Sequence, residues 1–135
     1  MARDEALRYA VGLGARRGIA AEEIVALVRG LVAKHGADLS RVSLCTLESK
    51  ADEPGVHEAA RELGIDVVFL PLEALKARKG AAPTHSPRVQ AMLGVGSVAE
   101  TAALVGAGPG SRLIAPRVAT PYAACALAVE AEETE

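Results

Sequence analysis

The fold is decided by the stretch Val11-Gly-Leu-Gly-Ala-Arg-Arg-Gly18. It extends a short apolar run, Tyr9–Leu13, that predicts a strand. It leads into Ala20–His35, where apolar residues recur at the i, i+3, i+4 spacing of an amphipathic helix. A glycine-rich turn between a strand and a helix N-terminus can present backbone N–H groups to an anion. The stretch therefore predicts an α/β protein in which this first turn forms one wall of a ligand site.

The rest of the chain continues the alternation of strands and helices. Short apolar runs predict four further strands, at Val42–Thr46, Asp66–Leu70, Arg112–Ala115 and Ala123–Val129. Helical spacing and capping residues predict helices at Val56–Leu63, within Pro71–Lys79, at Pro87–Leu93 and from Ser97 to about Val105. The contiguous apolar residues Val67, Val68 and Phe69 are typical of a strand that is covered on both faces.

This order of elements predicts the fold class. Strands that alternate with helices favour a parallel sheet with helices on both faces, and the two closing strands favour an antiparallel edge. We therefore expect a single domain over residues 1–135. It is a three-layer α/β/α sandwich with a mixed, mostly parallel sheet of about five strands. The acidic run from about residue 130 is expected to be a solvated tail.

The composition excludes several classes of function. The chain has a net charge of −2, no basic stripe, one Phe, two Tyr and no Trp, which argues against a nucleic-acid partner. No apolar run approaches the ~20 residues of a membrane-spanning helix, and the N-terminus lacks the apolar segment of a signal peptide. We therefore expect a cytoplasmic protein without a membrane partner. Cys45 and Cys125 are expected to be free thiols, and because no residues have metal-ligand spacing, neither metal nor cofactor is expected.

The first candidate site is the glycine-rich turn, with Gly12, Gly14 and Gly18 in its backbone and the side chains of Arg16 and Arg17. Its G-x-G-x-x-x-G spacing is one residue longer than the dinucleotide fingerprint, so a nucleotide-binding module is the weaker interpretation. An arginine fork matches a carboxylate through two parallel hydrogen bonds, which favours a carboxylate ligand. The structural alternative is that the glycines only make a tight turn between strand and helix.

The second candidate site is Lys50, Asp52 and Glu53, in the loop after the second predicted strand. A parallel sheet brings this loop to the same carboxyl-end edge as the first turn, and ligands bind at that edge of open α/β sheets. The alternative is that Asp52 or Glu53 caps the next helix and Lys50 is solvated.

The third candidate site is Gly96, Ser97, Val98 and Glu100, at the start of the last predicted helix. Ser97 and Glu100 have the S-x-x-E spacing of a capping box, which is the structural interpretation. The functional interpretation is that a second helix N-terminus is aimed at a ligand. Both interpretations hold together if Ser97 only fixes the end of the helix.

Three turns follow one another along the chain: Gly12-Leu-Gly-Ala-Arg-Arg-Gly18, Ser49-Lys-Ala-Asp-Glu-Pro-Gly55 and Gly96-Ser-Val-Ala-Glu100. Taken in this order, they resemble the cobalamin-biosynthesis family that comprises CobE and the C-terminal domain of CbiG. The resemblance extends from about Leu7 to Val129. One departure is Ile19-Ala-Ala21, where the family usually has a Ser or Thr cap before the first helix.

The resemblance implies a role in building the corrin ring of cobalamin. Within the family, CbiG is a cobalt-precorrin-5A hydrolase that opens a lactone and releases acetaldehyde, and CobE is the stand-alone counterpart of its C-terminal domain. We expect the chain to lack the N-terminal portion of CbiG and to be an accessory protein that binds a precorrin or cobalt-precorrin. The hydrolase activity is the alternative, and no catalytic residue is assigned. Other corrin-pathway enzymes are further partners that the resemblance implies.

Overall fold

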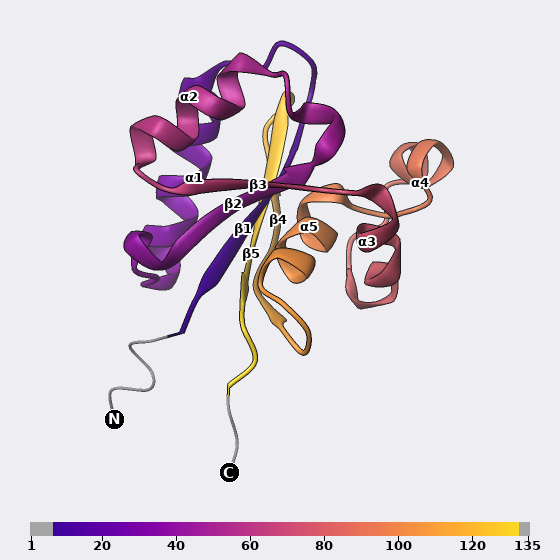
Figure 1. Cartoon of the computed structure of the whole chain (residues 1–135). Coiled ribbons are helices and arrows are strands. Elements are labelled where there is room, and N and C mark those ends of the chain that lie inside the picture. Colours follow the sequence, from indigo (N-terminus) through magenta and orange to yellow (C-terminus); the bar gives the residue numbers. More distant parts are fainter. Residues whose placement is uncertain (1–6, 133–135) are drawn as a thin grey trace.

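A five-stranded mixed sheet forms the centre of the computed structural model, which describes residues 7–132 (Figure 1). The strands are β1 (Tyr9–Ala15), β2 (Val42–Leu47), β3 (Asp66–Leu70), β4 (Arg112–Ala119) and β5 (Ala123–Val129). Their order across the sheet is β3-β2-β1-β5-β4. The first three are parallel, and β5 runs antiparallel to both of its neighbours. The predicted mixed sheet with an antiparallel edge is thus confirmed.

Helices cover both faces of this sheet, which confirms the predicted three layers (Figure 1). One face carries α1 (Ala21–His35) and α2 (Pro54–Leu63), and the other carries α3 (Leu72–Ala77), α4 (Pro87–Leu93) and α5 (Val98–Gly106). Short 3-10 helices lie between them, at η2 (Leu39–Arg41), η3 (Glu48–Lys50) and η4 (Lys79–Ala81). No single helix among the described residues is long and apolar enough to cross a membrane. Taken together, α4 and α5 have the length and apolar composition of a membrane span, but the two helices are bent by 63° relative to each other.

The helix α1 packs on the sheet through an apolar stripe. Ile24, Val28 and Leu31 are buried in one core cluster with residues of β1, β2 and β5, as the i, i+4, i+7 spacing requires. Gly36 ends the helix in the left-handed conformation, at φ 66°. At the other end, Ala20 occupies the N-cap position and makes no side-chain cap hydrogen bond.

The helix α5 lies directly on β1, because Gly12 has no side chain. A Cβ atom at Gly12 would overlap the backbone carbonyl oxygen of Ala99 and lie 2.5 Å from the backbone nitrogen of Ala103. This close approach buries the alanine-rich face of α5 against the sheet. Gly12 is therefore needed for the packing of α5 on β1. The spacing of glycines in the sequence alone does not distinguish this role from ligand binding.

The strand β3 differs from its prediction. It was expected to be covered on both faces, but it forms an edge of the sheet with β2 as its one strand neighbour, and 39% of the surface of Val68 is exposed. At the opposite edge, β4 is longer than predicted and continues past Pro116. Its register with β5 shifts on both sides of Ala115. Proline has no N–H to donate, so it fits an irregular edge strand.

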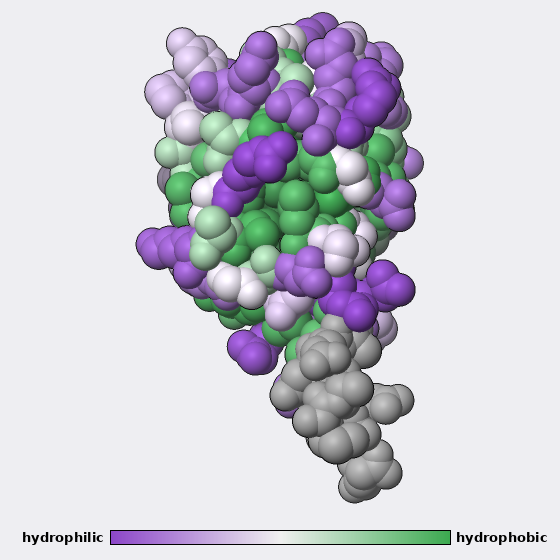
Figure 2. All heavy atoms as spheres, turned by 90° about the vertical axis from the view of Figure 1, so that its left-hand side faces the viewer, coloured by the Kyte–Doolittle hydropathy of each residue, from purple (hydrophilic) through white to green (hydrophobic). Residues whose placement is uncertain are grey.

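Polar side chains gather where β1 and β2 end. Figure 2 views the molecule from the side of α1 and α2 and shows hydrophobic residues in the middle of that face. Hydrophilic residues crowd its upper end, which is also the upper end of Figure 1. The loops at this end of the sheet follow the carboxyl ends of β1 and β2, where the first two predicted sites lie.

Candidate ligand-binding site

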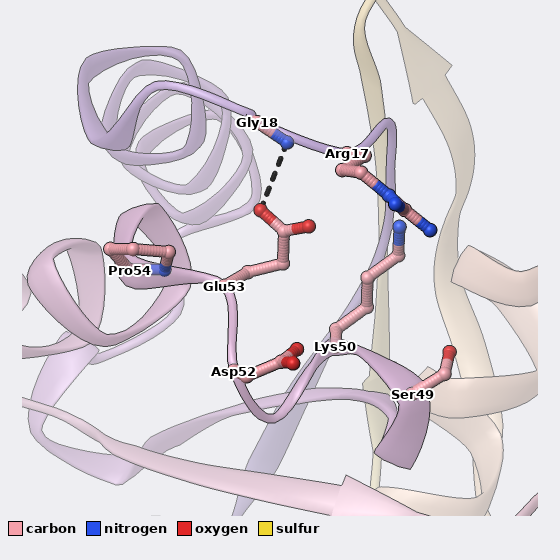
Figure 3. Close-up of a pocket in the computed structure, with 7 residues that line it drawn as sticks. All are labelled: Arg17, Gly18, Ser49, Lys50, Asp52, Glu53 and Pro54. Carbon is pink, nitrogen blue, oxygen red and sulfur yellow. Dashed lines mark hydrogen bonds between the residues drawn. The ribbon is translucent and has the colours of Figure 1, made fainter.

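Two adjoining hollows lie at the carboxyl-end edge of the sheet. The first hollow, of about 500 Å³, lies between the turn after β1 and the η3–α2 loop. Figure 3 shows the residues that line it: Arg17, Gly18, Ser49, Lys50, Asp52, Glu53 and Pro54. The structure thus brings the first and second predicted sites together, as the parallel arrangement of β1 and β2 requires.

A buried carboxylate joins these two loops. Glu53 is 9% exposed, and its Oε1 accepts a hydrogen bond of 2.9 Å from the backbone N–H of Gly18. Glu53 does occupy the N-cap position of α2, but its side chain makes no cap hydrogen bond. The alternative that this residue caps α2 through its side chain is therefore wrong. Its carboxylate instead holds the first turn, where Gly18 adopts φ 79°.

The second hollow, of about 570 Å³, is lined by more residues and by more segments of the chain than the first hollow. It lies between the first turn, η3, α4, the start of α5 and the turn from β4 to β5. Its lining includes five cationic side chains, those of Arg16, Arg17, Lys50, Arg88 and Arg117. Among the described residues, no Asp or Glu lines it. A chain that is acidic overall therefore has a local site of purely positive charge.

Exposed apolar side chains complete the second hollow. Met92 of α4 is 71% exposed and Tyr122 of the hairpin turn is 57% exposed, and both line it together with Val89 and Leu93. Small residues such as Gly14 and Gly96 lie between them. The hollow thus combines apolar surface with a cationic rim.

A single buried carboxylate holds two walls of the second hollow. Glu100 is fully buried. Its Oε1 accepts from the backbone N–H of Thr84 at 2.8 Å, and its Oε2 accepts from the Thr84 hydroxyl at 2.7 Å and from the backbone N–H of Arg117 at 2.9 Å. Thr84 precedes α4 and Arg117 lies in β4. Glu100 therefore fixes the two segments that carry Arg88 and Arg117.

The predicted capping box at the start of α5 is half formed. The hydroxyl of Ser97 accepts a hydrogen bond from the backbone N–H of Glu100 at 3.1 Å, as expected of an N-cap. The return bond from the Glu100 side chain to Ser97 is replaced by the contacts with Thr84 and Arg117. The capping interpretation accounts for Ser97 and does not account for the Glu100 carboxylate.

Backbone contacts attach the hairpin turn to the first turn. The N–H of Arg16 donates to the carbonyl oxygen of Tyr122 at 3.0 Å, so the two lie at fixed positions in the second hollow. The hydroxyl of Thr120 donates to Glu23 of α1 at 3.0 Å and accepts from the N–H of Tyr122 at 3.1 Å. The position of Tyr122 is therefore set by the backbone.

Most predicted site residues line one of the hollows, and two do not. Gly12 lies under α5, and Glu100 is buried behind the second hollow. The remaining predicted residues line a hollow: Gly14, Arg16, Arg17, Gly18, Lys50, Asp52, Glu53, Gly96, Ser97 and Val98.

Sequence reasoning missed the residues that α4 and the hairpin contribute. Arg88 and Met92 stand four residues apart on one helix, just after Pro87, and this i, i+4 spacing was the signal available for α4. Arg117 and Tyr122 flank the hairpin turn, and nothing in their spacing indicates that this turn folds toward the first turn.

The two cysteines lie outside this chemistry. Both are free and buried, as predicted, and burial raises the pKa of the Cys45 thiol and of the Cys125 thiol to about 12. A thiol with such a pKa stays protonated near neutral pH and is a poor nucleophile. Within residues 7–132, no group of three or more His, Cys, Asp or Glu side chains is arranged to hold a metal ion.

Comparison with known proteins identifies the family. Residues 9–129 match the family model described as cobalamin synthesis G C-terminus. The chain belongs to this family. The chain is also similar to the protein CobE of Sinorhizobium sp., which is 36% identical over 121 residues that cover 87% of this chain and 77% of that protein. The chain is thus a cobalamin biosynthesis protein of the CobE/CbiG type, which confirms the resemblance read from the three turns.

Solved structures of the family share this fold. A crystal structure of CobE, a protein from the cobalamin biosynthetic pathway, superposes with a TM-score of 0.87 at 30% identity and covers 96% of this chain and 94% of that one. The cobalamin biosynthesis protein chiG from Agrobacterium tumefaciens str. C58 superposes with a TM-score of 0.69 at 34% identity, covering 91% of this chain and 98% of that one.

Proposed function

We propose that this protein binds a precorrin or cobalt-precorrin in the second hollow and acts as a binding or accessory protein of corrin-ring synthesis. The observation that carries the proposal is the lining of that hollow: five cationic side chains, no carboxylate among the described residues, and exposed Met92 and Tyr122. Precorrins are macrocycles that carry several acetate and propionate groups. Their chemistry is complementary to this combination of charge and apolar surface.

The charges favour a ligand with more than one carboxylate. Arg16, Arg88 and Arg117 line the hollow from three different segments, the first turn, α4 and β4, so no single segment supplies its cations. Each guanidinium can bind a carboxylate through two parallel hydrogen bonds. A ligand with a single carboxylate would leave the other arginines repelling one another. A macrocycle with carboxylates around its rim would neutralise them together.

The lining favours binding over hydrolysis by this chain. Among the described residues, no histidine and no cysteine lines either hollow, so no Ser–His or Cys–His pair is available there. The hydrolase activity therefore remains the alternative, and acetaldehyde release is its direct test. A nucleotide-binding module is less well supported, because Gly12 contacts α5 and is not available to a pyrophosphate.

The proposal is tested by titrating the protein with a cobalt-precorrin or a late corrinoid and following the visible absorption bands. The double variant Arg88→Ala/Arg117→Ala removes cations that line the second hollow alone, and it should weaken binding at least about tenfold. The control is Arg29→Ala/Lys34→Ala, which removes the same charge from exposed positions of α1 and should leave the affinity unchanged. Equal affinities for the two double variants would contradict the proposed site, and no band shift with the wild-type protein would contradict the function.

A further inference from the structure

The two edges of the sheet are built differently. The edge strand β4 contains Pro116, and its register with β5 shifts on both sides of Ala115. Prolines and bulges are devices by which natural sheets prevent an edge from pairing with another strand. The other edge strand, β3, contains no proline and pairs with β2 in an uninterrupted register from Asp66 to Leu70. Both devices are therefore present at the β4 edge and absent from the β3 edge.

The outer side of β3 is open to a further strand. Among the described residues, no backbone hydrogen bond other than those of the sheet involves β3. Alternate residues of an edge strand point their N–H and C=O groups away from the sheet, so these groups lack a partner within the chain. Figure 1 shows β3 in front of the other strands, between the helices that cover the two faces. Val68, in the middle of β3, is 39% exposed.

The sequence of β3 is complementary to itself in an antiparallel arrangement. Pairing about Val68 sets this residue opposite its own copy and sets Val67 opposite Phe69. A β-branched residue opposite an aromatic residue is a stabilising cross-strand pair. Asp66, the one charged residue of β3, comes to lie opposite Leu70 and not opposite a second carboxylate. A pair of β3 strands in this register therefore has no like charges opposite each other.

We propose that β3 pairs antiparallel with β3 of a second copy of this chain, about a two-fold axis at Val68. The pairing joins the two sheets into one continuous sheet and satisfies the outward backbone groups of both edges. A two-fold interface uses the same surface on both copies, as this self-complementary strand requires. No residue of β3 lines either hollow, so the inference does not depend on the proposed function.

Sedimentation equilibrium of the full chain at increasing concentrations tests the pairing. The wild-type protein should reach twice the mass of one chain and dissociate reversibly on dilution. Val68→Lys sets two ammonium groups opposite each other at the axis, and it should raise the dissociation constant of the dimer at least about tenfold. The matched control is Val118→Lys, which makes the same change at a 48% exposed position of β4 and should keep the dimer.

A charge swap at the axis tests the register. Val68→Glu should be as monomeric as Val68→Lys, but an equimolar mixture of the two should form a heterodimer, because opposite charges then meet at position 68. In the wild-type protein, amide hydrogen exchange in β3 should slow as the concentration rises, while exchange in β4 should not change. Thermal unfolding checks that each variant is folded.

Several results would overturn the pairing. A wild-type protein that is monomeric at ~1 mM would do so, as would a dimer that persists in Val68→Lys or is lost in Val118→Lys. A monomeric mixture of Val68→Lys and Val68→Glu would overturn the register about Val68. Exchange in β3 that is the same at all concentrations would contradict the interface without the use of any variant.

Discussion

The two hollows share Arg17, Ser49 and Lys50, yet they differ in the elements that complete them. The loop before α2 adds Asp52 and Glu53 to the first hollow, whereas α4 and the β4–β5 hairpin add arginines and apolar side chains to the second. The same cations therefore face acidic groups on one side and none on the other. The loop after β2 thus lines both a hollow with acidic groups and a hollow without them. The variants below test the two hollows separately.

The largest effect is expected from Gly12→Ala, because it disturbs the packing of α5 on β1 that supports the edge of the sheet. The new Cβ would overlap the backbone of α5, which must move and take the start of the helix with it. We expect a loss of about 3 kcal/mol in the free energy of unfolding, measured by urea denaturation.

The matched control for this variant is Gly30→Ala in α1. A Cβ at Gly30 meets nothing within 4 Å, so the substitution should raise stability by up to ~1 kcal/mol through helix propensity. If Gly12→Ala were as stable as the wild-type protein, the close contact between β1 and α5 would not be tight, and the packing role assigned to Gly12 would be wrong.

A smaller and more local effect is expected from Glu100→Ala. The substitution removes the acceptor of three hydrogen bonds behind the second hollow, and we expect a loss of about 2–3 kcal/mol. Amide hydrogen exchange should accelerate at Thr84 and Arg117. Exchange at Gly18, which is bonded to Glu53 in the first hollow, should stay slow. The control is Glu62→Ala at an exposed position of α2. Equal acceleration at Gly18 would mean that the hollows are not held independently.

The smallest effect concerns the apolar surface of the second hollow. Tyr122→Ala should weaken corrin binding about fivefold, because the ring contact is lost while the backbone bonds of this residue remain. Tyr122→Phe should bind like the wild-type protein. An affinity unchanged in Tyr122→Ala would remove this side chain from the site.

The sequence predicted the sheet and the edge well because both follow from local patterns. The three parallel strands, the hairpin and the stop of α1 at Gly36 depend on short apolar runs and single residues with clear conformational preferences. The error at β3 has a different origin. Its apolar run predicted cover on both faces, but the position of a strand within the sheet depends on the whole topology.

The roles of individual site residues could be predicted only in part, because they depend on contacts between distant segments. Asp52 or Glu53 was expected to cap α2, yet the Glu53 carboxylate reaches Gly18, which lies 35 residues away. Spacing likewise located Ser97, while the partners of Glu100 come from two other segments. Arg117 was not predicted as a site residue, because the sequence of two paired strands does not indicate which loop their residues will face.

The three contacts of Glu100 also constrain how this sequence can change over time. Two oxygens of one carboxylate satisfy donors from Thr84 and Arg117, so replacing Glu100 alone leaves these partly buried donors without their acceptor. A substitution at position 84 removes the hydroxyl donor, whereas position 117 contributes its backbone N–H, which every residue except proline retains. Relatives that lose Glu100 are therefore expected to have replaced Thr84 as well, so positions 84 and 100 should vary as a pair.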